Sequence, residues 1–236
     1  MKNLALLSAV LFAFSAQTPA AQTAAPQVVR QLVYEFGYNT KVAKSGNGTG
    51  TTTIKIYAPA ADGSIEISGQ DYWWNTVRPR AVNTCKLSPA GSVSCSAMPY
   101  AISPIQLTIF PLLAHGFFKG VTTAGSTKNA TYKLAAAILP GNSSYAGQLV
   151  TWDCAYALHG KGPIANAAPM VLVQTTGTLT QEGGRYFKMN SKQRIAYDPV
   201  AMIPVIVSDL RTHYPQHNVY NNDDIELKLT KDSAQH

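Results

Sequence analysis

The chain has 236 residues and a formal net charge of +7, yet only 13% of its residues are charged, about half the fraction of a typical soluble protein. Its length suits one domain with a core of its own. The basic residues are scattered without a run of five, which argues against a nucleic-acid-binding surface because such a surface gathers Lys and Arg on one face. The low charge and the many Thr, Ser and Asn residues favour a β protein outside the cytoplasm, and a pI near 9.3 favours weak attraction to an anionic membrane surface or cell-wall polymer.

The N-terminus has the pattern of a secretory signal peptide. Lys2 precedes an apolar run over residues 4–14, and small and polar residues follow as far as Ala25. The run is too short to span a bilayer, and no second long apolar run follows, so we expect no transmembrane segment after the signal is removed. The sequence therefore predicts an exported protein, periplasmic or extracellular, with a signal peptide at 1–20, a disordered segment at 21–27, one β-rich domain at 28–231 and a disordered tail at 232–236.

Alternating apolar and polar residues predict three β-strands in the first third of the chain. Gly, Pro and Asn separate them, and Asp62-Gly63 is the strongest hairpin signal because both residue types tolerate the positive φ of a tight turn. The expected strands cover residues 28–38, 51–58 and 64–74.

Two adjacent tryptophans, Trp73 and Trp74, end the third of these strands. Neighbouring residues of a strand face opposite ways, so one indole is expected inside the fold and the other outside or in a groove. With Arg78 and Arg80 nearby, the pair would form a stacking platform for a sugar or another flat ligand. The alternative is one Trp in the core and one that covers the sheet edge.

The three cysteines are Cys85, Cys95 and Cys154. A hairpin between the first two would place them opposite each other on adjacent strands, at a separation that suits a disulfide, and an exported compartment permits one. Cys154 stands at an apolar position of an alternating stretch, so it is expected to point into the core as a buried free thiol.

Ser103-Pro104 begins the one convincing helix of the sequence. Ser is a good N-cap, Pro is tolerated at the first helical position, and Pro111 ends or kinks the helix. The helix is short and very apolar, which predicts a plug across the concave face of a curved sheet. If a ligand lies between helix and sheet, its contacts are expected from Ile105, Leu107, Ile109, Phe110 and Phe117, together with Trp73 and Trp74. The other interpretation is a plain core helix.

The stretch from Met170 to Asp209 predicts a β-meander. An apolar run and a Thr-rich run lead into Gly183-Gly184, a two-residue turn that matches strand twist. A second extended run then ends at Asp198-Pro199, before a third strand begins. Further strands are expected at 131–139, 149–158 and 224–230, where apolar and polar residues alternate.

No catalytic motif emerges from the sequence. The best metal candidate is His213 with His217, close to Asp223 and Asp224, but Pro215 prevents the regular helix that would put both imidazoles on one face. The acidic residues are otherwise spread along the chain. We therefore expect no cofactor, and we favour a protein without enzymatic activity.

The predicted fold is mainly β, an antiparallel meander that forms a curved sheet or incomplete β-barrel with one short apolar helix packed on its inner face. This layout is similar in element order to the half-barrel lipoprotein carriers of the bacterial envelope, a resemblance that implies a lipid site lined by the helix. Two functions stay open. The first is a non-catalytic exported protein that binds an apolar or amphiphilic ligand, such as a lipid, between sheet and helix. The second is a structural or interaction module of the cell envelope that binds protein or polysaccharide.

Overall fold

The computed structural model describes residues 27–40, 47–73, 81–89, 92–98, 103–114, 116–138, 149–182, 187–214 and 221–234. The predicted signal peptide, the Gly183-Gly184 turn, Trp74 and His217 lie outside these ranges.

Strands dominate the described part of the chain, and one helix interrupts them. The strands are β1 (Val28–Thr40), β2 (Gly48–Tyr57), β3 (Ile65–Trp73), β4 (Ala81–Leu87), β5 (Ser92–Met98), β6 (Thr127–Ile138), β7 (Leu149–Pro163), β8 (Val171–Glu182), β9 (Phe187–Asp198), β10 (Ile203–Tyr214) and β11 (Asn221–Ala234). The helix, α1 (Pro104–Leu112), lies between β5 and β6 in the chain. β11 extends beyond the predicted domain end at 231, and Ala234 still pairs with Arg30 of β1.

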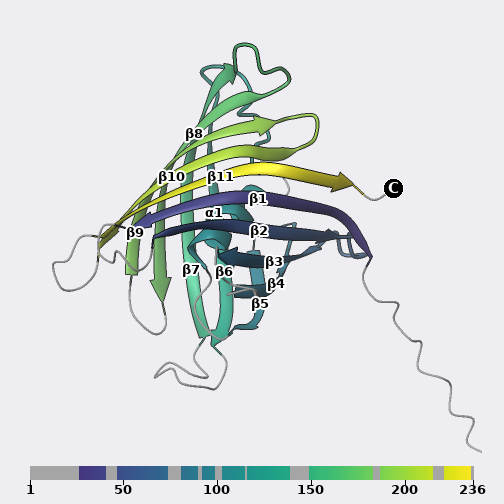
Figure 1. Ribbon diagram of the computed structural model, residues 1–236, viewed down its shortest axis with the longest axis vertical. Coiled ribbons are helices and arrows are strands. Elements are labelled where there is room, and N and C mark those ends of the chain that lie inside the picture. Colours follow the sequence, from purple (N-terminus) through teal and green to yellow (C-terminus); the bar gives the residue numbers. More distant parts are fainter. Residues whose placement is uncertain are drawn as a thin grey trace, which may run out of the picture.

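The strands form one closed barrel, drawn in Figure 1. Successive strands pair antiparallel, and β1 closes the barrel by pairing antiparallel with β11. The exception is the parallel pair of β5 and β6, which the long connection through α1 makes possible. The predicted mainly β fold is confirmed, and the sheet curves to full closure.

Strand alternation decides which side chains fill the barrel. Inward positions of β7 are buried, whereas His159 on the opposite face is exposed. The buried side chains of this strand include Val150, Trp152, Cys154, Tyr156 and Leu158. The alternation of apolar and polar residues in this part of the sequence therefore identifies the side chains on the inner face of the barrel, as predicted.

α1 begins as the sequence predicts and is enclosed by the barrel (Figure 1). Ser103 is the N-cap, and its Oγ accepts a hydrogen bond from the backbone N–H of Gln106 at 3.1 Å. Every side chain from Ile105 to Leu112 is buried, so the helix has no solvent face. It is therefore the predicted plug. No helix within the described ranges has the length and apolar composition needed to cross a membrane.

β3 approaches α1 most closely at Gly69. A Cβ at this position would lie 2.9 Å from the ring of Phe110 and 3.0 Å from the side chain of Gln106. Glycine therefore leaves the room that the helix needs against this strand.

Cys85 and Cys95 form the predicted disulfide between paired positions of β4 and β5. Cys154 is free and buried, and burial raises the pKa of its thiol to about 12. The thiol is protonated at neutral pH, which suits a core residue and not a nucleophile.

Candidate binding site

Most side chains predicted to contact a ligand beneath the helix are packed in the core. Ile105, Leu107, Ile109 and Phe110 are at most 2% exposed, and none of them borders the two hollows described below. Phe117 does border one of them. The candidate site therefore lies at the C-terminal end of α1 and not along its length.

One buried polar cluster ties the middle of α1 to the wall of the barrel. Asp209 on β10 accepts hydrogen bonds from Ser191 at 2.7 Å, Gln193 at 3.2 Å and Arg211 at 2.9 Å. Thr108 of α1 joins this cluster, since its Oγ1 accepts from Nη2 of Arg211 and lies 3.1 Å from the carboxylate of Asp209. The cluster contains an ion pair sealed from water and holds the helix against β9 and β10.

A second buried carboxylate, that of Asp71 on β3, faces the N-terminus of α1. It accepts hydrogen bonds from the hydroxyl of Thr52 at 2.7 Å and from the hydroxyl of Ser103. Since Ser103 is also the N-cap, one side chain joins the first turn of the helix to the strand. Burial raises the pKa of Asp71, although hydrogen bonds from Ser103, Thr52 and Gln106 oppose the rise.

Neither polar cluster borders the barrel-end pocket or the outer-wall groove, the two hollows described below. Their role is to fix the position of α1, because buried polar groups with hydrogen-bond partners specify one arrangement of the elements that carry them.

The end of the barrel beside the C-terminal end of α1 holds a pocket of about 640 Å³, which we call the barrel-end pocket. Small-molecule sites span roughly 300–1,000 Å³. The helix end, the segment after it, β2, β3 and the turn between β9 and β10 contribute to the lining. Its apolar side chains include Val29, Ile56, Ile65, Ile67, Leu112, Leu113, Phe117, Phe118, Met202 and Ile203.

Aromatic contacts fix the segment that follows α1. Phe118 stacks on Tyr197 with the ring centroids 4.1 Å apart, and Phe117 meets Tyr156 edge-on at 5.6 Å. Phe117 and Phe118 are themselves buried. The apolar wall that they give to the barrel-end pocket is therefore held in place by the barrel.

Both charged residues that line the barrel-end pocket are cations, Arg30 and Lys119. Arg30 is engaged, because Nε and Nη2 donate to Asp232 at 2.9 and 2.6 Å and Nη1 donates to the carbonyl of Ala201 at 2.7 Å. Lys119 is exposed, and no carboxylate of the described residues lies within ion-pair distance of it. The pocket thus joins an apolar interior to one available ammonium group.

The turn between β9 and β10 places an unusual residue beside the pocket. Met202 has a φ of 56°, in the left-handed region that favours Gly and Asn, and its side chain is 66% exposed. Val200 in the same turn is 79% exposed. Among the described residues, the other non-glycine position with positive φ is Asn166, a residue type that tolerates it. Local stability does not explain an exposed Met at this position.

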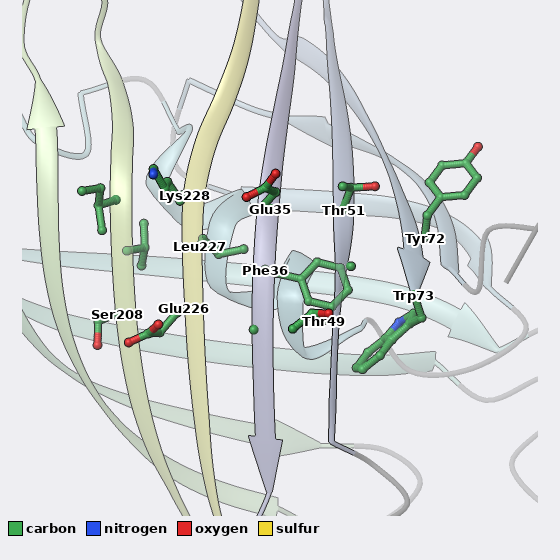
Figure 2. Close-up of a pocket in the computed structure, with 14 residues that line it drawn as sticks. Glu35, Phe36, Thr49, Thr51, Tyr72, Trp73, Ser208, Glu226, Leu227 and Lys228 are labelled. Carbon is green, nitrogen blue, oxygen red and sulfur yellow. The ribbon is translucent and has the colours of Figure 1, made fainter. Parts of the chain in front are cut away.

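A second hollow, the outer-wall groove of about 840 Å³, crosses β10, β11, β1, β2 and β3 and appears in Figure 2. Gly37 leaves it open, since a Cβ there would have no atom within 4 Å. Glu35 pairs with Lys228 across β1 and β11, and Gly37 pairs with Glu226 in the same register. The groove therefore carries charges of both signs, in contrast to the barrel-end pocket.

Trp73 contacts the core and also borders the outer-wall groove (Figure 2). Its ring meets Phe36 edge-on at a centroid distance of 5.0 Å and Tyr38 at 5.7 Å. Trp74, the second indole of the predicted platform, lies outside the described residues.

The predicted metal pair, His213 and His217, also lies outside the described side chains. Within the described ranges, no three His, Cys, Asp or Glu side chains gather closely enough to hold a metal ion.

Sequence reasoning missed most of the barrel-end pocket. Leu113 follows the predicted helix break, and Tyr197 and Met202 come from a distant hairpin. One feature of the sequence does point to the pocket. Turns favour polar residues, yet the apolar Val200 and Met202 follow directly after the turn residues Asp198-Pro199.

No family model, no curated protein and no solved structure matches this chain. Its function therefore rests on the chemistry of the two hollows.

Proposed function

We propose that this chain is an exported, non-catalytic protein that binds a small apolar or amphiphilic molecule in the barrel-end pocket. The observation that carries the proposal is a hollow of about 640 Å³, lined mainly by apolar side chains, where the helical plug ends. A ligand there would gain about 25 cal/mol for each Å² of apolar surface removed from water. The N-terminal signal pattern and the Cys85–Cys95 disulfide support export.

Met202 gives independent support. A residue that departs from its usual backbone preference points to a functional constraint. Its exposed thioether side chain borders the pocket, and Met adapts to ligands of varied shape. An apolar ligand would cover the surface that this side chain leaves in water.

A titration with the neutral fluorophore N-phenylnaphthylamine tests the proposal, because its emission rises when it leaves water. We expect saturable binding by the wild type and several-fold weaker binding by Met202→Asn and Leu113→Gln, which replace apolar lining with amides. Leu210→Gln is the matched control, since Leu210 is 48% exposed and does not border the pocket. Absence of saturable binding, or equal binding by all four proteins, would contradict the proposal.

The outer-wall groove supports a second candidate function, an interaction module that binds a polar polymer such as a polysaccharide. The open space above Gly37 and the hydroxyl and carboxylate groups of Thr49, Thr51, Glu35 and Glu226 supply the shape and hydrogen-bonding groups. Gly37→Leu would fill this groove without touching the barrel-end pocket. Loss of retention on a cell-wall polysaccharide column by this variant, with probe binding unchanged, would favour the second function.

A further inference from the structure

We infer that the barrel-end pocket selects amphiphiles with an anionic headgroup, whose chain lies in the pocket and whose headgroup lies beside Lys119. This inference rests on the proposed function and names the class of ligand. Its basis is the distribution of charge around the pocket.

The segment after α1 carries apolar and cationic groups side by side. Phe117 and Phe118 are buried and supply pocket lining, and Lys119 follows them directly. Two glycines with positive φ bracket this segment, Gly116 at 74° and Gly120 at 82°, and the backbone N–H of Lys119 donates to the carbonyl of Gly116 at 3.0 Å. A tight turn therefore presents an ammonium group at the edge of an apolar wall, which is the arrangement that an anionic amphiphile complements.

A second lysine adds to the positive charge of this segment. Nζ of Lys128 donates hydrogen bonds to the carbonyls of Gly116 at 2.5 Å and Phe117 at 3.3 Å. Burial lowers the pKa of Lys128, and the nearby charge of Lys119 lowers it further. The two ammonium groups are thus close enough to repel each other, and an anion beside Lys119 would relieve that repulsion.

The carboxylates near the pocket are already engaged. Asp232 pairs with Arg30, and Oδ1 of Asp198 accepts hydrogen bonds from the backbone N–H groups of Val200 and Ala201. Neither is among the residues that line the pocket. Lys119 therefore remains available to a ligand. Among the described residues, no acidic side chain lines the pocket, so the ammonium group of Lys119 favours an anionic ligand over a neutral one.

Displacement of bound N-phenylnaphthylamine by amphiphiles with one common chain tests the inference. The competitors are dodecanoate, dodecyl phosphate and the uncharged dodecanol. We expect both anions to displace the probe at lower concentration than the alcohol, with an advantage that shrinks at high salt because the contact is solvent-exposed. The order of the two anions shows whether the site prefers a carboxylate or a phosphate.

The substitution Lys119→Gln tests the contribution of the positive charge of this side chain. The variant is expected to bind both anions roughly two- to fivefold more weakly, the loss of one exposed ion pair, and to bind dodecanol and the probe as the wild type does. Lys192→Gln on the exposed face of β9 is the matched control with the same change in net charge. It is expected to leave all affinities unchanged.

The outcomes separate the inference from the proposed function. If the alcohol competes as well as the anions, or if Lys119→Gln weakens no anion, the charge inference is overturned while the apolar pocket stands. If the wild type binds neither probe nor amphiphile, the proposed function itself fails, and the inference fails with it.

Discussion

Arg211 and Asp209 face each other inside the barrel, with Nε of the guanidinium 2.9 Å from Oδ2 of the carboxylate and both side chains at most 2% exposed. Thr108 of α1 contacts both groups. The hydrogen bonds of Thr108 therefore join the plug to an ion pair of the wall, and water cannot replace a partner of this buried pair if one is lost. A buried charge without its partner is costly, whereas replacing both partners by apolar groups costs much less.

Arg211→Met is therefore expected to lower the free energy of unfolding by about 3–5 kcal/mol, measured by urea denaturation. The double variant Arg211→Met/Asp209→Leu is expected to be more stable than this single variant, because no unpaired charge remains. Arg194→Met, at an exposed position of β9, is the control and should stay close to the wild type. A single variant as stable as the wild type would show that the pair does not hold the fold.

The buried carboxyl of Asp71 predicts a dependence of stability on pH. Its raised pKa means that the folded protein binds more protons than the unfolded chain above the ordinary value of 3.8. Its contribution to stability is thus fully present below that value and is lost as the pH rises through the folded pKa. Asp71→Asn cannot titrate at this position. The free energy of unfolding of the wild type minus that of the variant should therefore fall as the pH rises above about 4, and a flat or rising difference would argue against a raised pKa.

The close approach of α1 to β3 predicts that an added methyl group destabilises the fold at Gly69, whereas Gly37, away from this contact, accepts it. Gly69→Ala is expected to lower the free energy of unfolding by about 1–3 kcal/mol, because its Cβ would lie 2.9 Å from the ring of Phe110. Gly37→Ala should be neutral or slightly stabilising, since its Cβ would meet open space. Urea denaturation of both variants measures the contrast. Equal effects would mean that the helix does not need the room that Gly69 leaves.

Met202→Asn should change stability and binding in opposite directions. Asn tolerates the left-handed backbone of this turn better than Met, so the free energy of unfolding is expected to rise by up to about 1 kcal/mol. The loss of an exposed apolar side chain beside the pocket is expected to weaken probe binding. Thermal denaturation and the probe titration, run on the same preparation, measure the two effects. A stabilised variant with unchanged affinity would remove Met202 from the site.

Local patterns in the sequence predict the elements of this fold well. Apolar alternation along β7 predicts the inward face of that strand, and Ser103-Pro104 predicts the start of α1. The spacing of Cys85 and Cys95 predicts their disulfide. Each of these features depends on residues close together in the chain, where period, capping and turn chemistry act directly.

The candidate site could not be predicted in the same way, because it depends on barrel closure. Pairing of β1 with β11 brings Arg30 beside Asp232, 202 positions away in the chain. The same closure encloses α1, so that most of its apolar side chains belong to the core. The pocket forms only at the C-terminal end of the helix. Nothing in the local pattern of 113–119 or 198–203 shows that these segments meet.

Photo-crosslinking with a dodecanoate analogue that carries a diazirine at the end of its chain tests the central claim most directly. After irradiation and proteolysis, mass spectrometry identifies the labelled peptides. We predict adducts on the segments that contain Leu113, Phe117, Tyr197 and Met202, reduced by excess unlabelled dodecanoate. Adducts confined to the outer-wall groove around Gly37, or labelling that excess ligand does not reduce, would contradict ligand binding in the barrel-end pocket.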